Sequence, residues 1–151
     1  MHINNRGLIL IKIIKGYGSQ YSASTCGKII SHGNDKSRKE KVLKTHTNKK
    51  TAHQKVQLYS DGRSVKRFVH RLVAETFLDN PLKLPCVNHK DNDPTNNNVE
   101  NLEWCTQQEN IKHYFDNFFV RKENNPINLE MHLARFLRKT KLTRDELKEL
   151  L

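Results

Sequence analysis

The sequence predicts an α+β protein with a small antiparallel β module, a central strand-loop-strand-helix unit and C-terminal helices. Three observations carry this prediction. Apolar, β-branched residues interrupted by glycines over residues 8–31 are typical of short strands. The pair Asp61-Gly62 separates two alternating segments, as in a hairpin. Thr-x-x-Glu capping boxes at Thr106 and Thr143 predict two helix starts. With 151 residues and 35% hydrophobic content, the chain can form one compact domain with appendages.

The charge balance indicates a polyanionic partner. Lys and Arg number 27 against 16 Asp and Glu, which gives a formal net charge of +11. Nucleic acid is the leading candidate, because a basic protein attracts its phosphates. A membrane surface would require a basic amphipathic helix with a large apolar face or a lipidation signal, and the sequence shows neither. We therefore expect nucleic acid as the partner and no membrane.

The cysteine pattern indicates free thiols. Cys26, Cys86 and Cys105 are too far apart for a Cys-x-x-Cys zinc pair. An odd number of cysteines without a secretory signal also argues against a disulfide framework. We expect an intracellular, reducing compartment and no structural zinc.

Residues 8–31 are expected to form a small sheet. The run from Leu8 to Ile14 is interrupted by Lys12 and is shorter than the roughly 20 residues of a membrane-spanning helix. We interpret it as a buried strand. The glycines that punctuate the following strands are Gly16, Gly18 and Gly27.

Residues 35–50 carry seven basic side chains against Asp35 and Glu40, without sustained periodicity. The simplest interpretation is a solvated loop. In a chain of net charge +11, an arm that contacts phosphates through residues such as Lys39 and Lys41 is the alternative.

A β-hairpin is predicted from residues 55–59 and 65–69. Its alternation places Val56 and Leu58 on one face, opposite Lys55, Gln57 and Tyr59.

A helix is then predicted over residues 70–77, with Leu72, Val73 and Phe77 buried, and ends before Asp79-Asn80-Pro81. On this helix His70 is open to a structural role or a phosphate contact, and we prefer the structural role. Arg71 is open to an ion pair with Glu75 or a contact with DNA.

The central unit combines a strand over residues 84–91, a polar loop over 92–98 and a second strand over 99–105. The capping box at Thr106 then starts a helix at residue 106 or 107. Asn110 lies in its first or second turn, where we expect it to face the two strands. The asparagines of the loop are expected to be turn formers without a catalytic role.

Chemistry is expected in this unit, because His89 is followed after 12 and 21 residues by Asn101 and Asn110. Histidine is the side chain whose unperturbed pKa suits a general base near neutral pH. Oxygen donors in the same segment suit a divalent cation such as Mg²⁺.

The C-terminal part is expected to hold an amphipathic helix over residues 129–139, with Leu133, Phe136 and Leu137 at helical spacing, and a short helix from Thr143 to Leu151. Two helices with a tight turn are compatible with helix-turn-helix DNA binding. The acidic side chains of the second helix would face phosphates poorly, so we prefer a packing or dimer-contact role.

Several segments with fixed spacings resemble the HNH endonuclease family, in particular its phage and intron-encoded homing branch. They are Val69 to Phe77, Asn80-Pro81, Val87 to Asp91, Asn97-Asn98, Asn101 to Trp104 and Thr106 to Asn110. Residues 14–31 also resemble the small modular segment that often precedes the nuclease in that branch. This module usually has a tryptophan where the present chain has Ile11.

The resemblance implies a ββα unit that holds one metal ion, Mg²⁺ or Mn²⁺. It implies catalytic roles for His89, as the general base, and for Asn101, which ties the loop to the active-site strand. It places Asn88 and Asn110 at the metal-ligand positions. Several relatives have a carboxylate where Asn88 stands, and a neutral amide binds a hard cation more weakly.

The expected function is a metal-dependent, sequence-specific endonuclease that hydrolyses double-stranded DNA, as a monomer or homodimer, in a host cytoplasm if phage-encoded. The alternative is a non-cleaving DNA-binding protein or repressor that keeps the fold. RNA binding is less favoured, because no aromatic platform is recognisable.

The expected organisation is a β module with a basic arm over 1–50, a nuclease domain over 51–120 and a helical segment over 126–151. Expected DNA contacts are Lys39, Lys41, Lys55, Lys66, Arg67, Arg71 and Lys90.

Overall fold

The computed structural model describes residues 8–33, 39–47, 51–60, 62–120, 133–134, 137–138 and 143–150. The chain divides into two compact units, Met1–Trp104 and Cys105–Leu151, which we describe separately. The expected α+β class is confirmed. The expected domain boundaries near residues 50, 120 and 126 stay predictions.

The first unit begins with the predicted small sheet. It is antiparallel, with the order β1 (Ile11–Ile13), β2 (Tyr21–Ser24), β3 (Ile29–Ser31) and β4 (Lys41–Val42). The expectation that the first strand is buried is wrong, because Ile11 is 56% and Ile13 55% exposed. This strand lies at the sheet edge, and only Ile14, just after it, enters the core.

A second antiparallel sheet contains the predicted hairpin. Its order is β5 (His46–Thr47), β6 (Gln54–Ser60) and β7 (Arg63–Phe68). Val56 and Leu58 are fully buried and Tyr59 is exposed, so the predicted alternation is confirmed. The basic run over residues 35–50 is not entirely a loop, because β4 and β5 form within it by pairing with β3 and β6.

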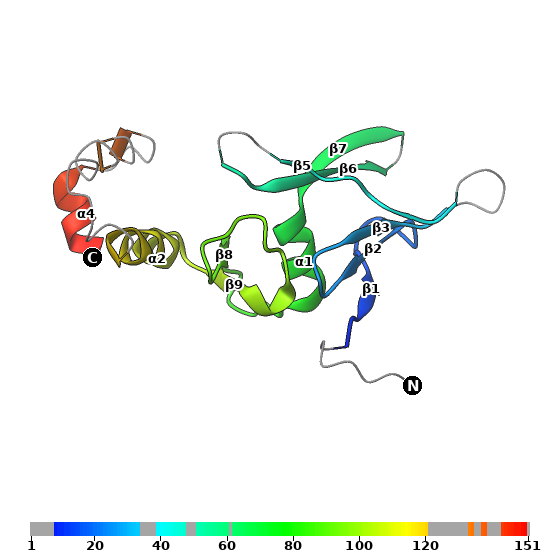
Figure 1. Ribbon diagram of the computed structural model, residues 1–151, viewed down its shortest axis with the longest axis horizontal. Helices are drawn as coiled ribbons and strands as arrows, with labels where there is room; N and C mark the ends of the chain where they lie inside the picture. Colours follow the sequence, from blue (N-terminus) through cyan, green and yellow to red (C-terminus); the bar gives the residue numbers. More distant parts are fainter. Residues whose placement is uncertain are drawn as a thin grey trace. The chain divides into compact units, whose positions relative to one another are not determined.

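Helix α1 (Val69–Phe77) follows β7 directly and contacts strands of all three sheets (Figure 1). Leu72 and Val73 are fully buried, as predicted, whereas Phe77 is only partly buried. The helix ends when the backbone turns extended at Leu78, whose N–H bonds the Ala74 carbonyl. The carbonyl of Leu78 accepts a hydrogen bond from the Trp104 indole at 3.3 Å.

The third sheet pairs β8 (Cys86–His89) with β9 (Leu102–Cys105). The predicted second strand over 99–105 is only partly right, because its first three residues form a 3₁₀ turn, η1 (Val99–Asn101). The Asn98 side chain caps this turn by accepting from the N–H of Glu100 at 3.1 Å. An Asn cap favours such a turn over extension of the strand.

One hydrophobic core joins the three sheets and α1 of the first unit. It combines side chains of the N-terminal strands with those of the hairpin, α1 and the β8–β9 sheet. Its members include Ile14, Ala23, Ile29, Val56, Leu58, Leu72, Val87 and Leu102. The N-terminal β module is therefore packed as part of the same folded unit.

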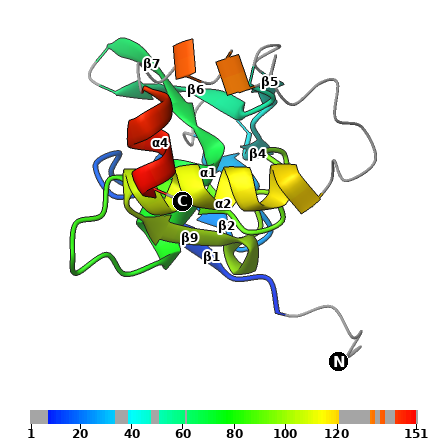
Figure 2. The same cartoon turned by 90° about the vertical axis from the view of Figure 1, so that its left-hand side faces the viewer.

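The second unit contains α2 (Gln107–Val120) and α4 (Arg144–Leu150). Both predicted capping boxes are present, because the Glu109 N–H bonds the Thr106 hydroxyl at 3.1 Å and the Glu146 N–H bonds Thr143 at 3.2 Å. The two helices pack together through a small cluster (Figure 2). Its members are Ile111, Phe115 and Leu147, with Leu133 and Leu137 packed against them.

Of the helix predicted over 129–139, residues 133–134 and 137–138 are described and helical, and Phe136 lies outside the described residues.

Within the described part of the chain, no helix combines the length and apolar character needed to cross a membrane. Cys26, Cys86 and Cys105, all within the described residues, form no disulfide.

Candidate active site

His89 lies at the end of β8 and is only 6% exposed. Its neighbour Asn88 is also buried. Most buried polar side chains in folded proteins have hydrogen-bond partners. The partners of these two side chains define the site.

The partner of His89 is Asn97, in the loop between β8 and β9. The His89 Nε2 atom lies 3.4 Å from the Asn97 Oδ1 atom. Asn97 Nδ2 donates to the Thr95 carbonyl at 3.0 Å and to Gln54 Oε1 at 2.9 Å. Because a backbone carbonyl only accepts hydrogen bonds, the amide nitrogen must face Thr95 and the amide oxygen must face His89. His89 therefore donates from Nε2, which leaves the Nδ1 lone pair free to take a proton.

Burial lowers the pKa of His89 below its usual 6.5. The hydrogen bond to Asn97 and the carboxylates of Asp91 and Asp93 oppose this effect without reversing it. A histidine with a lowered pKa is neutral near pH 7, which is the form that accepts a proton. The side chain fits the general base expected from the sequence.

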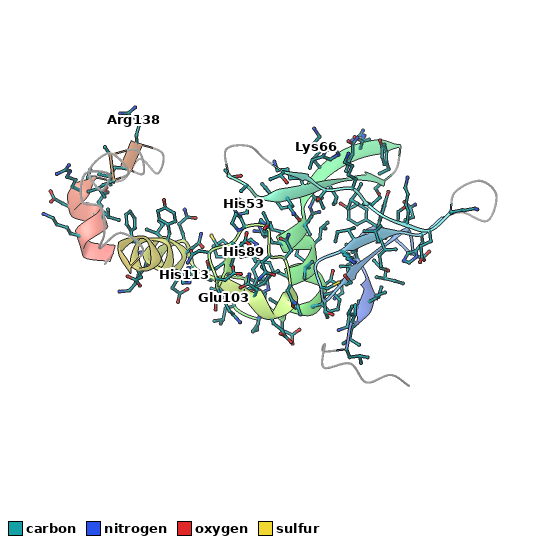
Figure 3. The ribbon with its side chains drawn as sticks, viewed as in Figure 1. His53, Lys66, His89, Glu103, His113 and Arg138 are labelled. Atoms are coloured by element: carbon teal, nitrogen blue, oxygen red, sulfur yellow. The ribbon has the colours of Figure 1, made fainter. Side chains whose placement is uncertain are left out.

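Two further imidazoles face His89. The ring centroids of His53 and His70 lie 5.6 Å and 5.1 Å from that of His89, and 5.0 Å from each other. In Figure 3, His53 and His89 lie next to each other between the β6–β7 hairpin and the β8–β9 sheet. His53 was not expected from the sequence, because this residue belongs to no motif and only the fold brings it to β8.

His70 is buried on the first turn of α1, and its Nδ1 atom has no hydrogen-bond partner. Desolvation by burial, with smaller contributions from His89, His53 and Arg71, lowers the pKa of His70 to about 3. A permanently neutral side chain in this position agrees with the preferred structural role. It also places an uncharged ring against the expected base.

Asn101 ties down the loop that follows His89. Its Oδ1 accepts from the Asp91 N–H at 3.1 Å, and its Nδ2 donates to Asp91 Oδ1 and to the Asn96 carbonyl, both at 2.9 Å. Its own carbonyl accepts from the Lys90 N–H at 2.9 Å. These bonds hold the loop against the end of β8, which is the geometry expected for this residue.

Asn88 is oriented by a carboxylate across the β8–β9 sheet. Its Nδ2 atom donates to Glu103 Oε1 at 2.8 Å, so its amide oxygen is the atom left for a cation. The labelled Glu103 of Figure 3 was not among the predicted site residues. Amide and carboxylate oxygens can coordinate Mg²⁺, together with water and phosphate oxygens.

The second expected metal ligand, Asn110, lies in the first turn of α2 in the second unit, and its role stays a prediction. No group of three or more His, Cys, Asp or Glu side chains is arranged to hold a metal ion in the described ranges. The oxygen donors near His89 fit a hard cation that relies on a few protein ligands together with water and phosphate.

Several of the expected DNA contacts already have partners within the protein. Arg71 donates to the Pro85 carbonyl at 2.9 Å and forms the alternative ion pair with Glu75 at 3.5 Å. Arg67 also pairs with Glu75, at 2.8 Å. Lys90 donates to the Glu100 carbonyl at 3.0 Å.

The remaining expected contacts differ in how freely they face solvent. The Lys55 ammonium lies over the Phe68 ring, 4.3 Å from its centroid. Lys39, Lys41 and Lys66 are exposed. DNA contact by each of these residues stays a prediction.

Comparisons with known proteins point to one family. Residues 67–112 match the family model described as HNH endonuclease. DNA endonuclease I-HmuI of Bacillus phage SP01 is 33% identical over 101 residues, which are 67% of this chain and 55% of that protein. The uncharacterized HNH endonuclease L245 of Acanthamoeba polyphaga mimivirus is 54% identical over 46 residues, 30% of this chain and 14% of the relative.

A solved structure agrees with these matches. The structure that describes DNA binding and cleavage by the HNH homing endonuclease I-HmuI superposes with a TM-score of 0.60 and 30% sequence identity. The match covers 83% of the present chain and 66% of that chain. The chain thus spans about half of I-HmuI by sequence and a small part of the mimiviral relative.

Proposed function

We propose that this chain, whose residues 67–112 belong to the HNH endonuclease family, is a metal-dependent endonuclease that hydrolyses phosphodiester bonds of double-stranded DNA. The observation that carries the proposal is the buried His89, with its Nδ1 atom free, next to the Asn88–Glu103 pair. The net charge of +11 supports a polyanionic substrate. The relative I-HmuI is described as binding and cleaving DNA.

Each side chain has a role that follows from its chemistry. His89 accepts a proton from the attacking water through Nδ1. Asn101 holds the loop after β8 in place. Asn88, oriented by Glu103, and Asn110 would hold a divalent cation, Mg²⁺ or Mn²⁺, which stabilises negative charge on the phosphate and the leaving oxygen when bound.

The finer details of the substrate belong to the same proposal. The exposed lysines Lys39, Lys41 and Lys66 neutralise phosphates of the DNA backbone. One site cuts one strand, so a double-strand break requires a homodimer or two successive nicks. We propose that the enzyme acts on a specific sequence, as homing endonucleases do.

The test is cleavage of a supercoiled plasmid that contains the target, with Mg²⁺, with Mn²⁺ and with EDTA. We expect relaxed or linear product with either cation and none with EDTA. Tight DNA binding in a gel-shift assay without cleavage in any divalent cation would contradict the proposal. That result would favour the alternative of a non-cleaving DNA-binding protein.

A further inference from the structure

We propose that Asn97 is a positioning residue for His89, and that the N-terminal β module holds Asn97 in place through Gly27. The inference rests on the proposed function, because it assumes that His89 is the base. It assigns the N-terminal module a part in building the active site. It also replaces the expectation that the asparagines of the loop only form turns.

The hydrogen bonds of the Asn97 amide fix its orientation. This side chain is 4% exposed, and both ends of its amide are engaged. Rotation of the amide by 180° would set its NH₂ group against His89 and its oxygen against the carbonyl of Thr95. Asn97 therefore presents a fixed acceptor to His89, which selects the tautomer with Nδ1 free.

The turn that joins β2 to β3 contacts Asn97. A Cβ atom built on Gly27 would lie 2.8 Å from both the Cβ and the carbonyl oxygen of Asn97. The backbone of the turn therefore lies directly against Asn97. The Val99 N–H also bonds the Thr25 carbonyl at 2.9 Å, which fixes the loop and the turn to each other.

Strand β6 also holds Asn97 through a hydrogen bond. Gln54, which accepts from Asn97 Nδ2, opens strand β6, and the preceding residue His53 faces the His89 ring. The β2–β3 turn, β6 and the β8–β9 loop thus meet at one side chain. A displacement of about 1 Å in such support can slow a reaction by about 10²-fold.

The structure offers a matched pair of glycine variants for the test. Gly27 has φ +81° and Gly16 has φ +87°, so alanine is strained to a similar degree at both positions. Only at Gly27 does the new methyl group meet other atoms, because nothing lies within 4 Å of the position on Gly16. Gly27→Ala displaces Asn97, and Gly16→Ala controls for backbone strain.

The first measurement is single-turnover plasmid nicking with Mg²⁺ by the full chain, with DNA affinity measured in parallel. We expect Asn97→Ala and Gly27→Ala to nick at least about tenfold more slowly at unchanged affinity. Gly16→Ala is expected to keep the wild-type rate. Wild-type rates in both Asn97→Ala and Gly27→Ala would overturn the inference.

The second measurement is the ¹⁵N NMR spectrum of the His89 imidazole, which reports its tautomer independently of activity. We expect Nε2–H in the wild type and in Gly16→Ala, and a mixture of tautomers in Asn97→Ala. A wild-type protein with the proton on Nδ1 would overturn the inference even if no variant folds. If His89→Ala cleaves normally, the proposed function fails instead, so the two failures are distinguishable.

Discussion

Three polar side chains of the site, Asn88, His89 and Asn97, are each less than a tenth exposed. Their burial is possible because each has a specific partner, Glu103 for Asn88 and the Asn97 amide for His89. Burial with fixed partners leaves one atom of Asn88 and one of His89 available to a ligand or substrate. These are the amide oxygen of Asn88 and Nδ1 of His89.

Glu103→Gln tests what the charge of Glu103 contributes to cation binding. The variant replaces the carboxylate that accepts from Asn88 Nδ2 at 2.8 Å by a neutral amide, which lowers the negative charge near the expected cation. Loss of such outer support typically costs about 10- to 100-fold in metal affinity. We expect the Mg²⁺ concentration for half-maximal cleavage to rise by that factor.

The control is Glu100→Gln, which removes the same charge from an exposed side chain of the nearby turn η1. This variant is expected to need no more Mg²⁺ than the wild type. An equal requirement in Glu103→Gln and Glu100→Gln would contradict the assigned role of Glu103.

The neutral state of His70 predicts how stability depends on pH. Burial makes a proton on His70 unfavourable in the folded protein, and the neighbouring His89, His53 and Arg71 add to this effect. The unfolded chain binds that proton near pH 6.5 and the folded chain only near pH 3. Folding stability contributed by this residue is therefore complete above about pH 6.5 and is lost as the pH falls toward 3.

Urea unfolding at pH 7 and pH 5 checks this expectation. We expect His70→Asn, which cannot titrate, to lose less stability than the wild type between these two pH values. The same loss in both proteins would show that His70 is not the source of the pH dependence.

At the level of single residues, the sequence pointed to His89 and Asn101 because both belong to a local pattern, and their catalytic roles stay predictions. It did not point to the contacts of His89 with His53 and Asn97, or to the contact of Asn88 with Glu103. Glu103 faces Asn88 only through the pairing of β8 with β9, and His53 reaches His89 only through the placement of β6. Such contacts depend on the pairing of separate segments, which residue spacing alone does not show.

At the level of elements, the best predictions concern features that are specified locally. The two capping boxes and the β6–β7 hairpin were expected from a few adjacent residues, and all three are present. The wrong predictions concern burial and pairing. The apolar β1 lies at an exposed edge, and the basic run contains β4 and β5, which form by pairing with β3 and β6.

Thr106→Ala tests the capping box of α2. The hydroxyl of Thr106 accepts from the Glu109 N–H, and its loss leaves a helix N–H without that partner. N-cap replacements of this kind cost about 1 kcal/mol. We expect the urea midpoint, followed by far-ultraviolet circular dichroism, to fall accordingly, whereas Gln108→Ala, an exposed change in the same turn, leaves it unchanged. Equal midpoints for the two variants would argue against the cap.

At the level of the whole molecule, the excess of positive charge predicts salt-dependent binding. Phosphate contacts release counterions, so the logarithm of the DNA-binding constant falls linearly with the logarithm of the salt concentration. Lys66→Ala is expected to make this slope shallower by about 1, because this exposed lysine on β7 is an expected phosphate contact.

Lys148→Ala is the matched control, because it removes the same charge from α4, which carries acidic residues next to it. A slope that changes as much in Lys148→Ala as in Lys66→Ala would show that only net charge matters. The hairpin would then have no special role in DNA binding.

The role of His89 as general base is tested most directly by the plasmid-nicking rates of His89→Ala and His46→Ala in Mg²⁺. His46 is an exposed histidine on β5 outside the site. General-base catalysis is typically worth about 10²- to 10⁴-fold, so we expect His89→Ala to lose that factor while it still binds DNA, and His46→Ala to cut at the wild-type rate. Undiminished cleavage by His89→Ala would contradict the account.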